Sequence, residues 1–142
     1  MPVFEWSPIY VLGVPEMDKT HEEFAQLLNA IADGPDEELL ARFDAFIAHT
    51  EEHFAREKRW MQELGFPADQ CHLGEHERAL KVIQAVRKRV AEADDFALGR
   101  RLVGELPQWF DNHASTMDSA LAHYLKEGGV PPEDAASCGG CG

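Results

Sequence analysis

The sequence has few basic residues, and it has no long apolar run. Its 142 residues include 13 Lys and Arg against 26 Asp and Glu, which gives a net charge of −13. A surface of this sign repels phosphate backbones, so we expect no nucleic-acid partner. No apolar run approaches the roughly 20 residues that a membrane-spanning helix needs, and the N-terminus lacks the pattern of a signal peptide. We therefore expect a cytoplasmic protein with no membrane partner.

Cysteine is also scarce. The odd count of three excludes a fully paired disulfide framework. Cys138 and Cys141 form a Cys-Gly-Gly-Cys motif that neither opens a helix nor follows a strand, in a glycine-rich segment. We expect residues 128–142 to be a flexible tail. A redox or metal-transfer partner that binds through Cys138 and Cys141 is a hypothesis that the motif leaves open.

Strand patterns are lacking too. No stretch alternates with period two between turn residues, whereas four segments carry apolar residues at spacings of three and four. These segments are residues 18–33, 36–64, 69–93 and a last one that runs from 94 or 95 to about 124. Asp18 is the expected N-cap of the first helix, Gly65 ends the second, and Asp94 or Asp95 caps the fourth. Gly104 and Pro107 predict a bend in the fourth helix.

The predicted fold is all-α. Four amphipathic helices joined by short turns favour an antiparallel up-down-up-down four-helix bundle, here over residues 15–127. Residues 1–14 contain two prolines between several aromatic side chains. We expect this segment to be an irregular N-terminal arm whose aromatic residues cover the outside of the bundle.

Histidine, in contrast, is plentiful. A single histidine on a helix is usually a surface residue or a hydrogen-bonded core residue, so only joint placement is informative. Five of the seven histidines lie on the apolar faces of the predicted helices: His21, His53, His72, His76 and His113. We interpret the other two as structural, because His49 falls toward the flank of its helix and His123 lies near a helix C-terminus.

Two acidic residues accompany these histidines. Glu57 follows His53 by four residues and therefore shares its helix face, and a carboxylate buried there requires a cation as its partner. Asp118 follows His113 by five residues, about 140° around an ideal helix, so both face one point only if the helix widens locally, as in a π-turn. The spacing alone leaves Asp118 open. The donor set exceeds what one metal ion needs and suits two.

These motifs resemble those of the bacterial hemerythrin-domain family. The resemblance spans roughly residues 5–125 and is carried by Gly13-Val-Pro-Glu-Met-Asp-Lys-Thr-His21, His53-Phe-x-x-Glu57, His72-x-x-x-His76 and Trp109-Phe-Asp-Asn-His113-x-x-x-x-Asp118. It implies a non-haem di-iron centre in which one iron takes His72, His76 and His113 and the other takes His21 and His53. Glu57 and Asp118 would bridge the two irons together with an oxo or hydroxo group.

The resemblance also implies a function. The iron with two histidines keeps an open position, which implies reversible O2 binding for carriage, storage or delivery. The O2 pocket would be lined by Phe24, Phe54, Trp109, Phe110 and Ala114. Plain core packing is the alternative reading of these five residues.

Two other functions compete with O2 binding. Di-iron oxidases on four-helix bundles typically use Glu-x-x-His pairs, and this sequence contains none, so we expect no enzyme, although weak oxidase or peroxidase activity stays open. The second alternative is sensing of O2, NO or redox state, or iron handling, through the same site. No signalling module accompanies the bundle in this sequence, which weakens the sensor reading.

Overall fold

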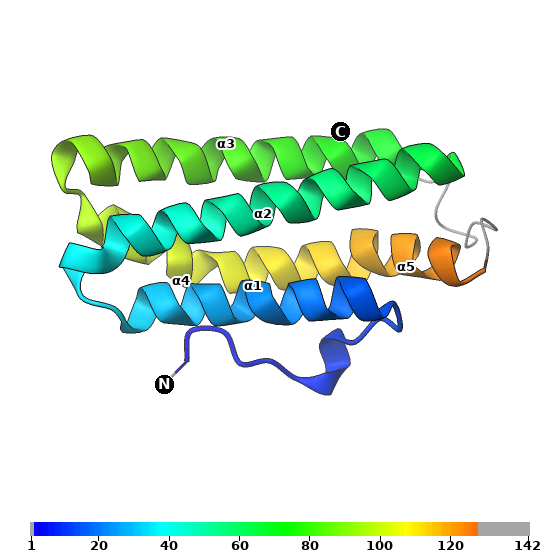
Figure 1. The fold of residues 1–142 in the computed structure, drawn as a ribbon, viewed down its shortest axis with the longest axis horizontal. Coiled ribbons are helices and arrows are strands. Elements are labelled where there is room, and N and C mark those ends of the chain that lie inside the picture. The colour runs from blue at the N-terminus through cyan, green and yellow to red at the C-terminus, as the bar shows by residue number, and fades with distance from the viewer. Residues whose placement is uncertain (1, 128–142) are drawn as a thin grey trace.

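Four long helices run alternately up and down along one axis in the computed structural model, which describes residues 2–127 (Figure 1). The helices are α1 (Pro15–Asp33), α2 (Asp36–Leu64), α3 (Asp69–Ala93) and α4 (Phe96–His113). The last helix continues through one π-helical turn, Ala114–Asp118, into α5 (Ser119–Lys126). No residue between 2 and 127 forms a strand. The prediction of an all-α, four-helix bundle is confirmed.

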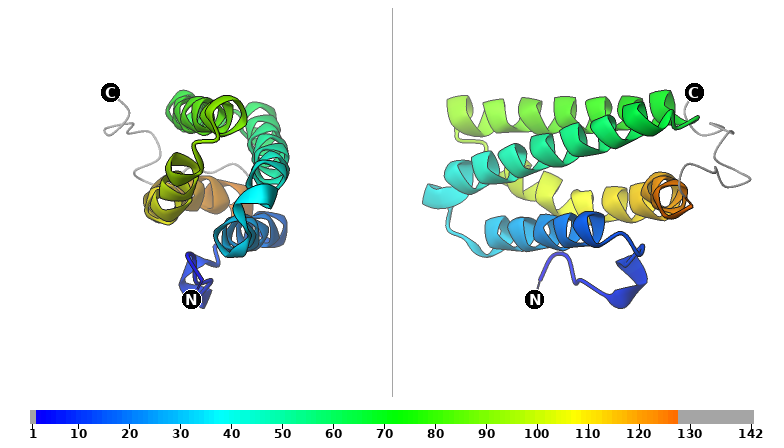
Figure 2. Two further views of the ribbon diagram at one scale, coloured as in Figure 1. Left: turned by 90° about the vertical axis from the view of Figure 1, so that its left-hand side faces the viewer. Right: turned by 45° about the vertical axis from the view of Figure 1, so that its right-hand side comes forward.

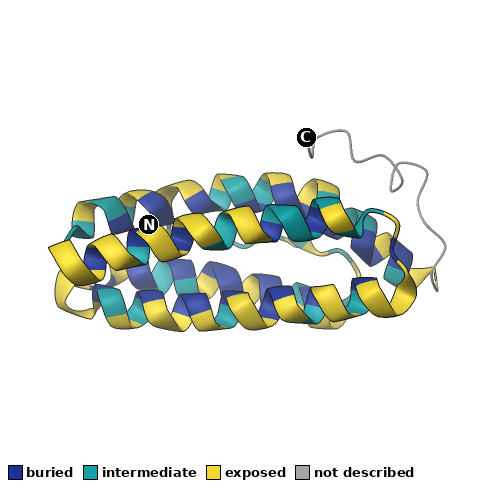
Figure 3. Ribbon diagram, turned by 90° about the horizontal axis from the view of Figure 1, so that it is seen from above, coloured by how far each residue is buried: buried dark blue, intermediate teal, exposed yellow. Residues whose placement is uncertain are grey.

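The helices surround a common interior. Each packs against its neighbour in the chain, and α4 closes the ring against α1, as the end-on view in Figure 2 shows. Buried residues follow the inner side of each helix and exposed residues the outer side (Figure 3). This is the arrangement that an apolar stripe at helical spacing produces.

The apolar interior is divided into two clusters. One is built around Phe24, Phe46 and Phe110, and the other around Met17 and Leu121. Along α1 and along the α4–α5 helix, the candidate ligand residues lie between members of the two clusters. The polar centre is therefore enclosed by apolar packing at both ends.

Two of the predicted helices have the expected bounds, Asp36–Leu64 and Asp69–Ala93. Gly65 follows α2 with a φ of 63°, in the left-handed region that glycine adopts readily. Asp95 caps α4, because its side chain accepts a hydrogen bond from the Leu98 amide. Pro107 lies inside α4 without ending it.

The predicted start of the first helix is wrong. α1 begins at Pro15 rather than after Asp18, because a proline at the first helical position has the right φ and needs no hydrogen bond for its nitrogen. The Asp18 carboxylate instead accepts hydrogen bonds from the amides of Leu12, at 2.7 Å, and Gly13, at 3.0 Å. Asp18 thus ties the N-terminal arm to α1.

The arm contributes to the core. Phe4 is buried, and its ring meets that of Phe110 with centroids 5.2 Å apart. The Asn29 side chain accepts a hydrogen bond from the Phe4 amide at 2.9 Å and donates one to the Phe4 carbonyl at 2.8 Å. The expectation that the arm's aromatic residues only cover the outside is therefore wrong for Phe4, whereas Trp6 and Tyr10 lie partly buried over the core.

Two expectations remain, one about the C-terminal segment and one about membrane-spanning helices. The predicted tail, residues 128–142 with Cys138 and Cys141, lies outside the described residues. None of the helices between residues 2 and 127 is long and apolar enough to span a membrane.

We predict that Phe4→Ala destabilises the protein by about 3 kcal/mol, because it removes a fully buried aromatic ring and leaves a cavity against Phe110. Ile9→Ala, in the same arm but at an exposed position, should change the free energy of unfolding by less than about 0.5 kcal/mol. Denaturant unfolding of both variants measures the difference. Equal, small effects would show that the arm does not belong to the core.

Candidate metal centre

Seven buried polar side chains from all four helices meet inside the bundle. They are His21 from α1, His53 and Glu57 from α2, His72 and His76 from α3, His113 from α4, and Asp118 from the π-helical turn. None of them exposes more than 4% of its surface. The structure therefore brings together all seven residues that the sequence predicts as metal ligands.

Three histidines form one group. The Nε2 atoms of His76 and His113 lie 3.0 Å apart, and His72 packs edge-on against both rings. One oxygen of each carboxylate joins them: Glu57 Oε1 lies 3.0 Å from His72 Nε2, and Asp118 Oδ1 lies 3.1 Å from His113 Nε2. The potential ligand atoms of this group lie within 4.8 Å of one another.

His21 and His53 form a second group, and their ring centroids are 5.1 Å apart. The remaining carboxylate oxygens reach them: Glu57 Oε2 lies 2.5 Å from His53 Nε2, and Asp118 Oδ2 lies 3.1 Å from His21 Nε2. Each carboxylate therefore presents one oxygen to the three-histidine group and the other to the two-histidine group. Both groups of side chains could therefore hold a metal ion, and the Glu57 carboxylate belongs to both.

The π-helical turn positions Asp118. Residues 114–118 adopt the wider helix, so the backbone between His113 and Asp118 contains one residue more than a normal helical turn. Both side chains consequently point to the same interior, and Asp118 is fully buried. The widening that the five-residue spacing requires is present.

Aromatic rings surround the imidazoles. Phe54 stacks on His76 with centroids 3.7 Å apart and an interplanar angle of 2°, and Trp109 stacks on His113 at 4.7 Å and 11°. On the other side of the centre, Phe110 meets the His21 ring edge-on at 4.9 Å. These contacts restrict the orientation of the rings.

The five residues of the predicted O2 pocket are divided between the two groups. Phe110 lies against His21, and Phe24 stacks on Phe110 with centroids 5.1 Å apart. Ala114 is buried beside them. Phe54 and Trp109 stack instead on imidazoles of the three-histidine group. The assignment of all five residues to an O2 pocket stays a prediction.

The two other histidines lie outside the centre. His49 Nε2 is 3.3 Å from the Glu23 carboxylate on α1, and His123 is exposed on α5. This placement agrees with their interpretation as structural residues.

The buried atoms of the centre fit a pair of cations. Among the described residues, several of them have no hydrogen-bond partner of good geometry: His21 Nε2, His72 Nε2, Glu57 Oε1 and both oxygens of Asp118. A buried carboxylate without a partner costs several kcal/mol, and a metal ion offsets this cost. Imidazole nitrogen combined with carboxylate oxygen is a donor set that suits iron.

The charges of the metal-free centre follow from the same contacts. Burial disfavours a charged imidazole, but the close, negatively charged carboxylates of Glu57 and Asp118 outweigh it and raise the pKa of His21 to about 9 and that of His72 to about 10. Burial, together with the charges of neighbouring histidines, lowers the pKa of His76 to about 2. Burial alone would raise the pKa of Glu57 and of Asp118, yet the surrounding histidines hold it well below its usual range.

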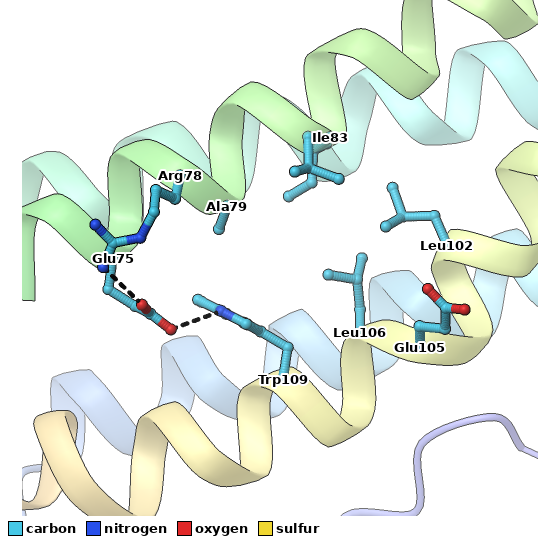
Figure 4. A pocket seen from close by; sticks show the side chains of 9 residues that line it. Glu75, Arg78, Ala79, Ile83, Leu102, Glu105, Leu106 and Trp109 are labelled. Atoms are coloured by element: carbon cyan, nitrogen blue, oxygen red, sulfur yellow. Dashed lines mark hydrogen bonds and ion pairs between the residues drawn. The ribbon is translucent and has the colours of Figure 1, made fainter. Parts of the chain in front are cut away.

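One residue beside the centre was not predicted from the sequence. Glu75, next to His76 on α3, accepts a hydrogen bond from Trp109 Nε1 at 3.0 Å (Figure 4). The two residues are 34 positions apart on different helices. Only the packing of α3 against α4 brings them together, and no sequence spacing marks such a pair.

Sequence comparisons find a matching family and several similar proteins. The sequence model of the Hemerythrin HHE cation binding domain matches residues 12–125. The chain is 44% identical to a "Bacteriohemerythrin" of Ralstonia nicotianae over 96% of its own length and 99% of that protein. It is 30% identical to one of Aquifex aeolicus over 77% of the chain and 87% of that protein. The identity to one of Pseudomonas paraeruginosa is 25%, over 86% of the chain and 84% of that protein.

We predict that loading the centre with divalent iron at pH 7 releases at least about two protons per chain. His21 and His72 are protonated at this pH, because the raised pKa of each lies above 7, and metal ligation requires the neutral ring. Calorimetry in buffers of different ionisation enthalpy measures the release. His49→Gln is the control and should release the same number, since burial lowers the pKa of His49 and keeps its ring neutral. Release of less than one proton per chain would contradict the assignment of His21 and His72 as protonated residues that give up their protons to bind metal.

Proposed function

The chain belongs to the hemerythrin family, and we propose on that premise that it binds O2 reversibly at a pair of iron ions. One observation carries the proposal. Glu57 and Asp118 each direct one oxygen to His72 and the other to a histidine of the His21/His53 group. Two buried carboxylates arranged in this way support two metal ions rather than one.

The ligands divide unequally. His72, His76 and His113 would hold one ion, and His21 with His53 would hold the other. An ion held by only two histidines would have room for a further ligand, and Phe110 and Phe24 pack on the His21 side of the centre. When bound, the iron pair supplies two electrons and a coordination position for O2.

The surrounding side chains protect that position from water. Phe110 and Phe24 are each 1% exposed, and the Phe4 ring of the arm covers Phe110 from outside. A dry, apolar surrounding disfavours the separation of charge that releases superoxide or peroxide into solvent. The proposed function is therefore binding and release, not oxidation of a substrate.

The composition of the centre supports binding over catalysis. Five of the seven proposed ligands are neutral imidazoles, and only two are carboxylates. Neutral ligands neutralise less of the positive charge of the ions, which favours the reduced pair over a strongly oxidising one. The histidine-rich centre thus supports the choice of carrier over oxidase.

Anaerobic reduction followed by exposure to air tests the function. Visible spectroscopy should show a charge-transfer band that appears with O2 and disappears when O2 is removed, at two irons per chain. Several cycles should preserve most of the band. Immediate, irreversible conversion to the oxidised pair would contradict reversible binding.

We predict that Glu57→Gln weakens iron binding at least about 100-fold, because the variant removes a bridging carboxylate and leaves His53 without a charged neighbour. Metal analysis after dialysis should find clearly fewer than two irons per chain. His49→Gln, in the same helix but outside the centre, should retain two. Full occupancy in Glu57→Gln would show that this carboxylate does not hold the pair.

A further inference from the structure

Within residues 2–127, no protein group accepts a hydrogen bond from the outer ring nitrogen of the five imidazoles of the centre. A histidine that binds a metal ordinarily donates its second ring nitrogen to a carboxylate, a carbonyl or water, which fixes the orientation of the ring. Within residues 2–127, the Nδ1 atoms of all five make no hydrogen bond: His21, His53, His72, His76 and His113. Ring contacts with neighbouring side chains therefore contribute to the orientation of these imidazoles.

For His113 this packing depends on Trp109. The indole lies nearly parallel to the imidazole, with centroids 4.7 Å apart and an angle of 11°. Trp109 precedes His113 by four residues on α4, so the two rings lie one above the other along the helix. The indole thus covers one face of the His113 ring and helps to orient it, beside the ring contacts of His72 and His76.

Trp109 is not held by packing on all sides. It lines a surface groove with a volume of about 420 Å³ between α3 and α4, whose floor includes Ala79, Ile83 and Leu106 (Figure 4). An indole beside such a space has room to rotate away from the imidazole. Its one hydrogen bond, from Nε1 to Glu75 Oε1 at 3.0 Å, opposes this rotation.

Glu75 has a second partner on its own helix. Its second oxygen, Oε2, accepts a hydrogen bond from Arg78 at 3.1 Å, so the two oxygens of one carboxylate serve different partners. The side chain of Arg78 is 58% exposed, and an exposed pair of this kind contributes little energy. The bond to Trp109 is the one that connects Glu75 with the interior.

We propose that Glu75 is a positioning residue of the metal centre, which acts through Trp109 on the orientation of His113. The proposal rests on the di-iron site proposed above. It assigns the effect to the hydrogen bond that Glu75 accepts and not to its negative charge. It also assigns the effect to one ligand, because His76 stacks on Phe54, which is only 6% exposed and needs no polar anchor.

Three variants of the iron-loaded protein test the proposal. Glu75→Ala removes the acceptor, and iron release to a chelator should become about ten-fold faster, as for the loss of other outer partners of metal ligands. Glu75→Gln keeps an acceptor oxygen at the same distance along the side chain and should restore release to within about two-fold of the natural protein. Arg78→Gln, the matched control, removes only the outer partner and should also stay within about two-fold.

The hyperfine-shifted proton resonances of the ligand imidazoles provide a second readout. In Glu75→Ala the resonances of His113 should shift, whereas those of His76 should stay in place. A general loss of stability would broaden or move all of them. Unshifted His113 resonances, or equal shifts of both, would overturn the proposal.

A double-mutant cycle tests whether Glu75 acts through Trp109. In Trp109→Phe an aromatic ring still stacks on His113, but the indole N–H that donates to Glu75 is absent. Adding Glu75→Ala should therefore change the rate of iron release less than two-fold further. A full ten-fold effect of Glu75→Ala in that background would mean that Glu75 acts by another route, and the proposal would be wrong. Iron release and resonance positions do not depend on O2 binding, so failure of the O2 function would be distinguishable from failure of this proposal.

Discussion

The structure of this bundle depends on balancing the negative charges of two fully buried carboxylates. Glu57 and Asp118 are both 0% exposed, and within residues 2–127 their ion-pair partners are imidazoles, with no lysine or arginine among them. The charge can be balanced by protons on His21 and His72, or by cations that displace those protons. Protons or cations can balance the charge only if the four helices are held in one register. The two apolar clusters, one at each end of the centre, provide that register.

The π-helical turn at Ala114–Asp118 is the departure from regular helix geometry that this arrangement requires. A normal helix would direct Asp118 away from His113, and one ligand would leave the interior. The extra residue in the turn corrects the direction without ending the helix, so that α5 continues to pack with Met17 and Met61. Irregular helical turns of this type occur frequently at functional sites. Here the irregularity has an identifiable effect, since it lets the fourth helix direct both His113 and Asp118, two of the proposed ligands, into the centre.

Much of this could be predicted from the sequence, for physical reasons. The bounds of α2 and α3 follow from strong helical periodicity and from Gly65, and the five inward histidines follow from the same periodicity. The start of α1 could not be predicted in this way, because Asp18 is equally suited to cap a helix and to bind the amides of the arm. Nor could the burial of Phe4 or the pairing of Glu75 with Trp109, since both depend on contacts between distant segments. Asp118 required the family resemblance, because its five-residue spacing from His113 left open whether the side chain faces the centre.

The position of the metals is the most direct test of the central claim. A crystal structure of the iron-loaded protein, measured with X-rays on both sides of the iron absorption edge, locates them without assumptions about ligands. The account predicts two anomalous peaks less than about 4 Å apart, with Glu57 and Asp118 each bound to both. A single peak, or two peaks that the carboxylates do not join, would contradict it.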